Sequence, residues 1–402
     1  MVQASRKELR ITHPDRIRAG FIPLLDAAPL IVAARCGFAA SEGLSIELQR
    51  ETSWATLRDR MAVGHLDVAH MLAPMPIATN LRLTPLPVRL IVPIALGVGG
   101  NTVTVSRALW ERLSESGASP DFDPRSAGRA LATVVAKRKA EKRAPLVIAI
   151  VHPHSAHRYQ LAYWLAASGI DPTTDLEIVV VPPPLMPAAL AAGQIDAFTA
   201  GEPWGGLAAA EGAGHILMTN MNIWRAGAEK VLGVRGDWAN EYGDHLERLV
   251  RAVYFAAQWC DDVANRDELA EILGASDVLA MGRHVIRRSL GRTLLAADGT
   301  MRSVDGFLQF AARNGTCPRT NHALLLFAQM VRWGEASLSA TALQTVRSTY
   351  RPDLYHAALP NLADIHDQAI LNSESFFDGR NFDADQIAAY VSGFDNRKPD
   401  YD

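Results

Sequence analysis

The sequence has little cysteine, no long apolar run and no excess of charge of one sign. Its three cysteines, Cys36, Cys260 and Cys317, are far apart and odd in number, which argues against a disulfide framework or a zinc knuckle. No apolar run reaches the length of a membrane span, so we expect no membrane contact. The formal net charge of -3 over 402 residues gives no reason to expect direct binding to nucleic acid. The remaining composition, 49% hydrophobic and 21% charged, is that of a globular chain long enough for more than one core.

The N-terminal segment also lacks the pattern of an export signal. Its first ten residues carry positive charge, but no apolar stretch of signal-peptide length follows. Asp15 and Arg16 interrupt the place where such a stretch would lie. We therefore expect a cytoplasmic protein.

The stretch from Pro145 to Trp204 organises the chain. Residues 145–151 form a continuous apolar run, typical of a strand covered on both faces in a parallel sheet. Ser155 then fits the N-cap of a helix, which places His157 in its first turn. Free backbone N–H groups and the positive end of the helix dipole meet there, so the turn is suited to binding an anion.

A second turn of this kind lies earlier in the chain. Thr52 or Ser53 can cap a helix over residues 55–63, which places Trp54 at a strand-to-helix turn. Trp54 is there either a packing residue or a platform for a ligand. Residues 97–102 are rich in glycine and form either a hinge or a plain turn, since they lack the lysine of a phosphate loop.

A repeated pattern predicts the domain organisation. Residues 63–69 and 192–198 each close a helix with glycine and open a strand with an apolar residue, aspartate and a small residue, so each ends one α/β half. We expect two interleaved lobes, with the first lobe over residues 1–97, the second over 98–202, and the first resumed over 203–402. Strands near residues 215–219 and 231–234 are expected in the resumed first lobe, followed by a helical extension that supports it.

Several candidate residues have two interpretations on sequence alone. His152, His154 and His157 lack a cysteine or carboxylate at a familiar metal-ligand spacing, so we expect no metal and no other cofactor. Glu202 and Trp204 either face a cleft or form a structural corner in which the carboxylate accepts backbone N–H bonds. No nucleophile elbow is present and nothing in the sequence demands catalysis, so we do not expect an enzyme.

Taken together, the motifs resemble one protein family over almost the whole chain. The matching residues, in order, are Thr52-Ser-Trp-Ala-Thr56, Arg58-Asp59, Ala73-Pro-Met-Pro76, Gly100-Asn101, His157, Tyr163-Trp-Leu-Ala166, Val180-Val-Pro-Pro-Pro184, Asp196-Ala-Phe198, Gly201-Glu-Pro-Trp204, Glu229-Lys230 and Ser375-Phe-Phe-Asp-Gly379. This pattern resembles the nitrate- and bicarbonate-binding branch of the ABC-transporter solute-binding proteins. The resemblance implies an α/β, two-lobed periplasmic-binding-protein-like fold of the second type, with a ligand cleft between the lobes.

The resemblance also implies a binding site. Trp54, Asn101, His157 and Lys230 match the family's nitrate contacts. The predicted ligand site also includes three further residues of the matched motifs: Gly100, Glu202 and Trp204. Asn101 departs from the family, in which the transport members have a longer amide side chain. Lys230 favours nitrate, because the bicarbonate binders that share this pattern place an acid there to hold a metal.

The expected cytoplasmic location indicates which member of the family the chain resembles. It is similar to the NasS-type sensors of nitrate assimilation, which bind nitrate or nitrite and control an RNA-binding antiterminator of the NasT type. One alternative is the substrate-binding component of a nitrate ABC transporter. A second is a cytoplasmic cofactor-biosynthesis enzyme on the same fold.

Overall fold

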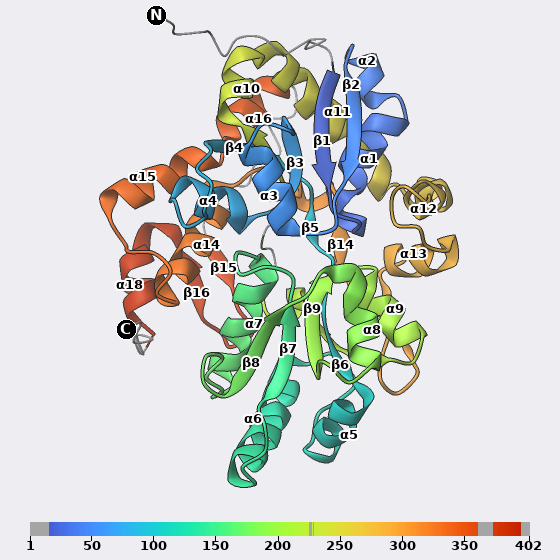
Figure 1. The fold of residues 1–402 in the computed structure, drawn as a ribbon, viewed down its shortest axis with the longest axis vertical. Coiled ribbons are helices and arrows are strands. Elements are labelled where there is room, and N and C mark those ends of the chain that lie inside the picture. The colour runs from blue at the N-terminus through green and yellow to red at the C-terminus, as the bar shows by residue number, and fades with distance from the viewer. Residues whose placement is uncertain (1–15, 225–226, 228, 361–372, 395–402) are drawn as a thin grey trace, which may run out of the picture.

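The computed structural model describes residues 16–224, 227, 229–360 and 373–394 and shows two lobes, each built on a five-stranded sheet (Figure 1). The first sheet has the order β2-β1-β3-β11-β4 and consists of β1 (Arg16–Phe21), β2 (Ser45–Arg50), β3 (Val68–Leu72), β4 (Leu90–Ala95) and β11 (Lys230–Arg235). The second has the order β10-β6-β9-β7-β8 and consists of β6 (Asn101–Ser106), β7 (Leu146–Ile150), β8 (Leu176–Val180), β9 (Ala197–Gly201) and β10 (Gly214–Thr219).

The two sheets share one pairing pattern, which confirms the predicted pair of α/β halves. In the first, β1 pairs parallel with β2 and β3, and β11 runs antiparallel to β3 and β4. In the second, β7 pairs parallel with β8 and β9, and β6 runs antiparallel to β9 and β10. The first lobe carries α1 (Ala28–Arg35), α2 (Phe38–Ser41), α3 (Trp54–Ala62) and α4 (Pro74–Asn80). The second carries α5 (Arg107–Glu115), α6 (Pro124–Ala140), α7 (Ala156–Ala167), α8 (Met186–Ala191) and α9 (Trp204–Ala210).

Both strand-to-helix turns predicted from capping residues are present. The Ser53 hydroxyl accepts a hydrogen bond from the backbone N–H of Thr56 at 3.2 Å, at the start of α3. The Ser155 hydroxyl accepts one from the backbone N–H of Arg158 at 3.2 Å, at the start of α7. Each cap satisfies one N–H group that the first turn of a helix would leave without a partner.

One strand lies in the other lobe from the one predicted. β10 pairs with β6, so the placement of residues 215–219 in the first lobe is wrong. After Gly201 the chain forms α9, which packs against β6, β9 and β10 and so keeps the chain on the second sheet. In terms of sheet pairing, the chain returns to the first lobe between β10 and β11, at Lys230.

The chain passes from the first lobe to the second through the glycine-rich segment around Gly97–Gly100. Its short strand β5 (Val98–Gly99) pairs with β14 (Leu308–Gln309). Gly99 has a φ of 75°, and a Cβ there would lie 2.1 Å from the carbonyl oxygen of Phe307. Glycine is therefore required by both the backbone conformation and the close approach. A hinge role for this segment stays a prediction.

The C-terminal extension contacts both lobes. It contains α10 (Gly236–Glu241), α11 (Gly243–Asp261), α12 (Arg266–Gly274), α13 (Arg283–Leu290), α14 (Thr320–Arg332), α15 (Ala340–Thr349), α16 (Pro352–Ala358), α18 (Ile387–Ser392) and the short strands β12 (Thr293–Leu295), β13 (Met301–Ser303), β15 (Ser373–Ser375) and β16 (Asn381–Asp383). As predicted, its helices support the first lobe, with α11 against α1 and α15 and α16 against β4. It also reaches α7 of the second lobe, where the Tyr163 hydroxyl donates to Asp378 at 2.9 Å and the Tyr159 hydroxyl donates to Glu335 at 2.6 Å.

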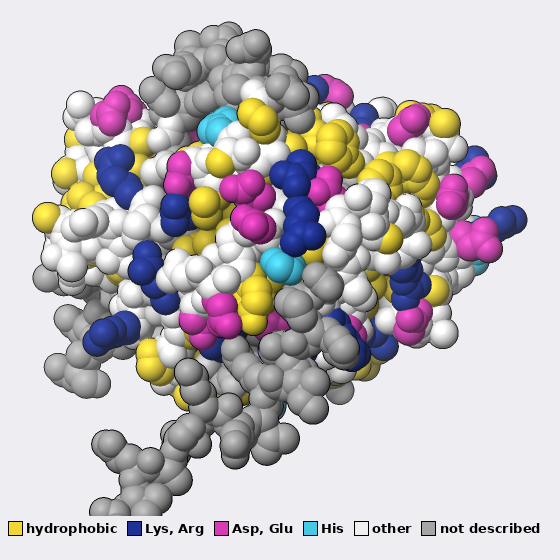
Figure 2. All heavy atoms as spheres, turned by 90° about the horizontal axis from the view of Figure 1, so that it is seen from above, with side chains coloured by type: hydrophobic (Ala, Val, Ile, Leu, Met, Phe, Trp, Pro, Cys, Tyr) yellow, Lys and Arg dark blue, Asp and Glu magenta, His cyan; other side chains and the backbone are white. Residues whose placement is uncertain are grey.

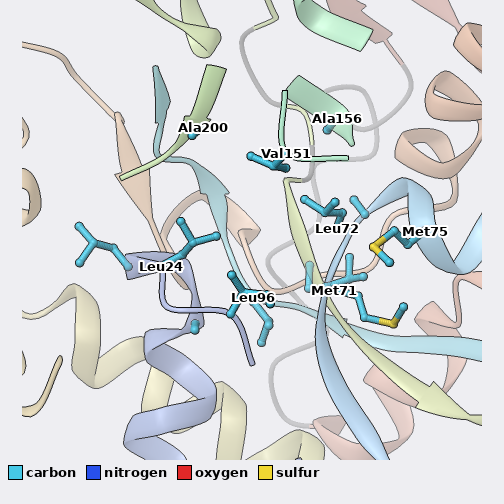
Figure 3. Close-up of a cluster of buried hydrophobic side chains, with 14 of the residues drawn as sticks. Leu24, Met71, Leu72, Met75, Leu96, Val151, Ala156 and Ala200 are labelled. Carbon is cyan, nitrogen blue, oxygen red and sulfur yellow. The ribbon is translucent and has the colours of Figure 1, made fainter. Parts of the chain in front are cut away.

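Apolar side chains from the two lobes meet between the sheets. Figure 3 shows Leu24 and Leu96 of the first lobe near Val151, Ala156 and Ala200 of the second. All five are at most 4% exposed, so the lobes share a continuous buried layer. Any polar side chain in this layer must find a partner in the protein or in a bound molecule.

The surface shown in Figure 2 carries charges of both signs. Over the face of the first lobe drawn in Figure 2, basic and acidic side chains are intermixed, and no large patch of one sign is visible there. Within the described ranges, no helix combines the length and the apolar character needed to cross a membrane.

Candidate functional site

Four residues predicted to contact the ligand are buried where the two lobes meet. Trp54 is the first residue of α3 and Lys230 the first of β11, both in the first lobe. Asn101 is the first residue of β6 and His157 the second of α7, both in the second lobe. Each is at most 1% exposed. We call these four, together with Asp26, His70 and Glu229, the cleft cluster.

The first lobe contributes the charged half of this cluster. The ammonium of Lys230 lies 2.8 Å from Oδ2 of Asp26, and Nε2 of His70 lies 3.0 Å from Oδ1 of the same carboxylate. Nδ1 of His70 faces the backbone N–H of Ile22 at 3.5 Å and accepts from it, which leaves the ring proton on Nε2, toward Asp26. Burial alone would raise the pKa of Asp26, but Lys230 and His70 outweigh it and lower this pKa to about 2. Asp26 is therefore ionised at neutral pH, and burial lowers the pKa of His70 so that its ring is neutral.

Trp54 packs against this charged half of the cluster. Its indole packs edge-on against the ring of His70, with the ring centroids 5.2 Å apart. The ammonium of Lys230 lies 6.0 Å from the centre of the indole ring. The indole N–H is buried and has no hydrogen-bond partner among the described residues.

The second lobe contributes polar groups that also lack partners. Both ring nitrogens of His157 and both polar atoms of the Asn101 amide are buried without a hydrogen bond to any described residue. A buried polar group left unpaired costs about 1–3 kcal/mol, and native structures contain few of them. Their concentration at one place indicates that a bound molecule completes these bonds.

Glu229 also has a buried polar atom without a hydrogen bond, and that atom lies near His157. Its Oε1 accepts a hydrogen bond from the side-chain amide of Gln160 at 2.8 Å. Its Oε2 has no hydrogen bond to a described residue and lies 3.8 Å from Nδ1 of His157. Burial lowers the pKa of His157, and the positive charge of Lys230 lowers it further, against the opposing effect of Glu229.

Gly201, opposite Asn101 in the β6–β9 pairing, leaves space beside the cluster. A Cβ at Gly201 would lie 3.1 Å from Oδ1 of Asn101 and 3.3 Å from Oδ2 of Asp26. Asn101 of the second lobe and Asp26 of the first therefore approach the same point. The missing side chain at Gly201 lets both keep their positions.

The other three predicted site residues are already satisfied by the protein. Glu202 accepts hydrogen bonds from Ser289 Oγ at 2.7 Å, Thr102 Oγ1 at 3.3 Å and the backbone N–H of Gly206 at 3.0 Å. Burial raises the pKa of Glu202, although these three donors oppose the shift. We call Thr102, Glu202, Trp204, Gly206 and Ser289 the corner cluster.

Trp204 and Gly100 belong to the same structural corner. The Trp204 indole donates to the carbonyl oxygen of Pro23 at 3.1 Å. The backbone N–H of Gly100 donates to the carbonyl of Phe307, and its carbonyl accepts from the backbone N–H of Glu202 at 2.8 Å. The geometry therefore favours the structural-corner interpretation for Glu202 and Trp204 and leaves Gly100 no free N–H for a ligand.

The three neighbouring histidines occupy separate environments. Nδ1 of His152 accepts from the backbone N–H of His154 at 3.0 Å, and burial lowers the pKa of His152 to about 3. Nδ1 of His154 lies 3.4 Å from the carboxylate of Glu335, whereas His157 faces the cleft cluster. Across the part of the chain that the structure describes, no group of three or more His, Cys, Asp or Glu side chains is arranged to hold a metal ion.

Sequence reasoning missed Asp26 and His70 as members of the site. Asp26 is a single acid in the apolar loop after β1, and His70 is a single polar residue in the buried strand β3. A titratable residue isolated in an apolar buried segment needs a partner, and that pattern was available in the sequence. Their partner Lys230 is about 160 to 200 residues further along the chain, so the pattern alone could not identify it.

The cleft cluster has the chemistry of a site for a small anion. A helix N-terminus at His157, indole and amide donors, and an ammonium held in place by Asp26 surround one buried region. Burying an anion requires hydrogen bonds on several sides, which these groups are placed to donate.

Comparison with known proteins agrees with this chemistry. The NMT1-like family model matches residues 12–274. The nitrate/nitrite binding protein NrtA of Synechococcus elongatus is 31% identical over 390 residues, covering 94% of this chain and 85% of that protein. The bicarbonate transport ATP-binding protein CmpC of the same species is 32% identical over 382 residues, covering 94% of this chain. The chain spans 54% of the length of that ATP-binding relative.

The fold comparison gives a similar result over nearly the full length. The crystal structure of the periplasmic nitrate-binding protein NrtA from Synechocystis PCC 6803 superimposes with a TM-score of 0.85 at 27% sequence identity. The match covers 95% of this chain and 98% of that one. The chain therefore has the two-lobed α/β fold of the solute-binding proteins.

Proposed function

Because the chain belongs to the NMT1-like family and to the nitrate- and bicarbonate-binding branch of the solute-binding proteins, we propose that it binds nitrate or nitrite between its two lobes. One observation carries the proposal: buried polar atoms of Trp54, Asn101 and His157 lack partners around the ammonium of Lys230. A small planar oxyanion has acceptor atoms on every side and could bond to all four side chains.

We propose nitrate or nitrite in preference to bicarbonate because of the charge at position 230. The family resemblance of the sequence implies that bicarbonate binders have an acid there to hold a metal, whereas Lys230 brings a positive charge. Among the described residues of the cleft, no group of acids and histidines is arranged to hold a metal ion.

Calorimetric titration with nitrate, nitrite, bicarbonate and methanesulfonate tests the proposal. We expect saturable binding of nitrate or nitrite with one site per chain, and weaker binding of the other two. Asn101→Ala should weaken the binding by ~0.5–1.5 kcal/mol, the value of one neutral hydrogen bond. The matched control is Asn222→Ala, outside the cleft cluster, which should leave the affinity unchanged. Tight bicarbonate binding with no response to nitrate would contradict the assignment.

We propose further that the bound anion serves as a signal. In this proposal the protein is a cytoplasmic nitrate/nitrite sensor that controls an RNA-binding antiterminator of the NasT type in nitrate assimilation. If the anion releases that partner, the partner must weaken anion binding by the same factor. A coupling of ~1–3 kcal/mol is typical of such switches.

The alternative proposal is delivery of the anion to an ABC transporter, and it is supported by the names of the relatives, which include transport proteins. Cell fractionation and co-purification distinguish the two uses. A sensor is expected in the cytoplasm, in a complex with the antiterminator that nitrate dissociates. A periplasmic protein, or a complex equally stable with and without nitrate, would contradict sensing and favour transport. The enzyme alternative gains no support from these relatives, which are named as binding and transport proteins.

A further inference from the structure

The buried charges of the cleft cluster do not balance. It contains one ammonium, Lys230, and two carboxylates, Asp26 and Glu229, each at most 4% exposed. Asp26 lies 2.8 Å from the ammonium and neutralises it. With neutral imidazole rings, the formal charge of the cluster is therefore that of the Glu229 carboxylate, one negative charge in excess.

A monovalent anion entering this site would add a second negative charge. Two like charges in a buried region repel strongly, and the cost of removing each from water is several kcal/mol. The N-terminus of α7 offers only about half a unit of positive charge in compensation. The charges of the cleft cluster are thus poorly matched to a bare anion.

The geometry offers one place for a compensating positive charge. Nδ1 of His157 lies 3.8 Å from Oε2 of Glu229, and neither atom has another hydrogen-bond partner among the described residues. A proton on this pair would turn the contact into a charge-assisted interaction. It would also leave Nε2 of His157 as a second donor, free to bond to an anion.

We propose that nitrate or nitrite enters this site together with one proton, which the His157–Glu229 pair holds. The inference rests on the proposed function and adds a co-ligand to it. The proton comes from solvent and attaches to an imidazole nitrogen or a carboxylate oxygen of the pair, and no other covalent bond forms or breaks. By linkage, the anion raises the pair's affinity for the proton by the same factor as the proton raises the affinity for the anion.

The other titratable groups around His157 are not placed to take up this proton. Asp26 is held ionised by Lys230, with a pKa of about 2. His70 already directs its single ring proton toward Asp26, because its other nitrogen accepts from Ile22.

On the second-lobe side, burial keeps His152 neutral, with a pKa of about 3. Arg58 contributes a fixed positive charge near His152, and the Gln160 amide that contacts Glu229 does not titrate. Burial lowers the pKa of His157, so its ring begins without the extra proton at neutral pH. The His157–Glu229 pair is therefore the group in the cluster whose protonation the anion can change.

The number of protons taken up on binding tests the inference. Nitrate is titrated into the full chain at pH 7.5 in buffers of different ionisation enthalpy, and the slope of the binding enthalpy against that value gives the proton number. We expect about one proton per nitrate, and an affinity that falls roughly tenfold per pH unit between pH 7 and 9. Glu229→Gln removes the excess charge and keeps a hydrogen-bonding side chain toward Gln160. In that variant the uptake should fall toward zero and the pH profile should flatten, whereas the exposed control Glu177→Gln should behave as the wild-type protein.

Each outcome separates this inference from the proposed function. Nitrate binding by the wild-type protein with no proton uptake and a flat profile would overturn the inference and leave the proposed function intact. Uptake that persists unchanged in both Glu229→Gln and His157→Asn would overturn the assignment to this pair. If the wild-type protein binds neither nitrate nor nitrite at any pH from 5.5 to 9, the proposed function itself falls.

Discussion

The cleft cluster and the corner cluster share two kinds of buried side chain and differ in how these are hydrogen-bonded. Each contains a buried carboxylate and a buried tryptophan at the start of a helix, and each lies beside a glycine that leaves room for them. In the corner cluster, Glu202 and Trp204 find all their principal partners in the protein. In the cleft cluster, Trp54, Asn101 and His157 find none among the described residues. Completeness of hydrogen bonding, and not the presence of a buried carboxylate and tryptophan, therefore distinguishes the structural site from the candidate binding site.

The largest expected change in stability comes from substituting the charged pair of the cleft cluster, Asp26 and Lys230. Lys230→Met leaves Asp26 buried without its partner, which should lower the free energy of unfolding by ~3–5 kcal/mol. The double variant Asp26→Asn/Lys230→Met removes both charges and keeps an acceptor for His70, so it should recover most of that stability. It should still bind nitrate ~1.5–3 kcal/mol more weakly, roughly 10- to 150-fold, because the charged donor is gone. Urea unfolding and calorimetric titration measure the two effects.

Two outcomes of this cycle would contradict the comparison. A Lys230→Met protein as stable as the wild-type protein would show that the Asp26–Lys230 pair is not the buried ion pair described. A double variant that binds nitrate with wild-type affinity would remove Lys230 from the site. Ser289→Ala in the corner cluster is the control, and it should change stability without changing the affinity.

The sequence predicted the parts of the cleft cluster that depend on local pattern. The capping residues predicted a helix over residues 55–63 and a second helix with His157 in its first turn. The structure confirms both helices, with α3 beginning one residue earlier, at Trp54, and α7 beginning at Ala156. The family pattern added Lys230, which is buried in the structure; its contact with a ligand stays a prediction. Local capping and family motifs are encoded in a few adjacent residues, which a single sequence can show.

The remaining parts depend on segments that are distant in the sequence. The Asp26–Lys230 contact joins residues about 200 positions apart, and nothing near Asp26 in the chain identifies its partner. The turn at Gly201 likewise gives no indication that β10 pairs with β6, because that choice depends on how α9 packs. Glu202 had two equally good interpretations until its three donors were located. Tertiary packing decided each of these cases.

The second prediction compares two glycines four residues apart. A Cβ at Gly205 would lie 2.1 Å from Thr102 Oγ1 and 2.8 Å from Glu202 Oε1, in the corner cluster. Gly205→Ala should therefore lower the free energy of unfolding by ~1–3 kcal/mol and leave nitrate affinity unchanged.

A Cβ at Gly201 would lie 3.1 Å from Asn101 and 3.3 Å from Asp26, and small shifts of these two side chains can relieve the close contacts. Gly201→Ala should cost less stability but weaken nitrate binding by about 1.4 kcal/mol, roughly tenfold. The reverse assignment of effects, measured by urea unfolding and titration, would overturn the distinction between the clusters.

The third prediction concerns the two carboxylates, whose pKa values are shifted in opposite directions. The pKa of Asp26 is lowered from 3.8 to about 2, so its contribution of about 2 kcal/mol is present above pH 3.8 and is lost as the pH falls toward 2. The pKa of Glu202 is raised above 4.5, chiefly by burial, so its contribution is present below pH 4.5 and is lost as the pH rises through its folded-state pKa. Unfolding free energies of Asp26→Asn and Glu202→Gln are compared with wild-type values from pH 2 to 7. Asp26→Asn should remove a rise in stability with pH below pH 4, and Glu202→Gln should remove a decline above pH 4.5. The same slope change in both variants would contradict the opposite shifts.

The last and smallest effect concerns the two tryptophans, which offer the closest match between the clusters. Both are buried at the first position of a helix, Trp54 in α3 and Trp204 in α9. The Trp204 indole N–H donates to the Pro23 carbonyl at 3.1 Å, whereas that of Trp54 has no partner among the described residues. Replacement by phenylalanine removes the N–H and one ring in both.

Beyond the loss of ring contacts that the two share, Trp204→Phe should cost ~1 kcal/mol of stability for its hydrogen bond and leave nitrate affinity unchanged. Trp54→Phe loses no hydrogen bond in the empty protein, so its extra cost should appear when nitrate is bound, as an affinity weaker by ~0.5–1.5 kcal/mol. Thermal unfolding with and without saturating nitrate measures both terms: nitrate should raise the Tm of Trp204→Phe by as much as that of the wild-type protein, and that of Trp54→Phe by less. Equal nitrate-dependent shifts in the two variants would show that the unpaired indole of Trp54 does not face the ligand.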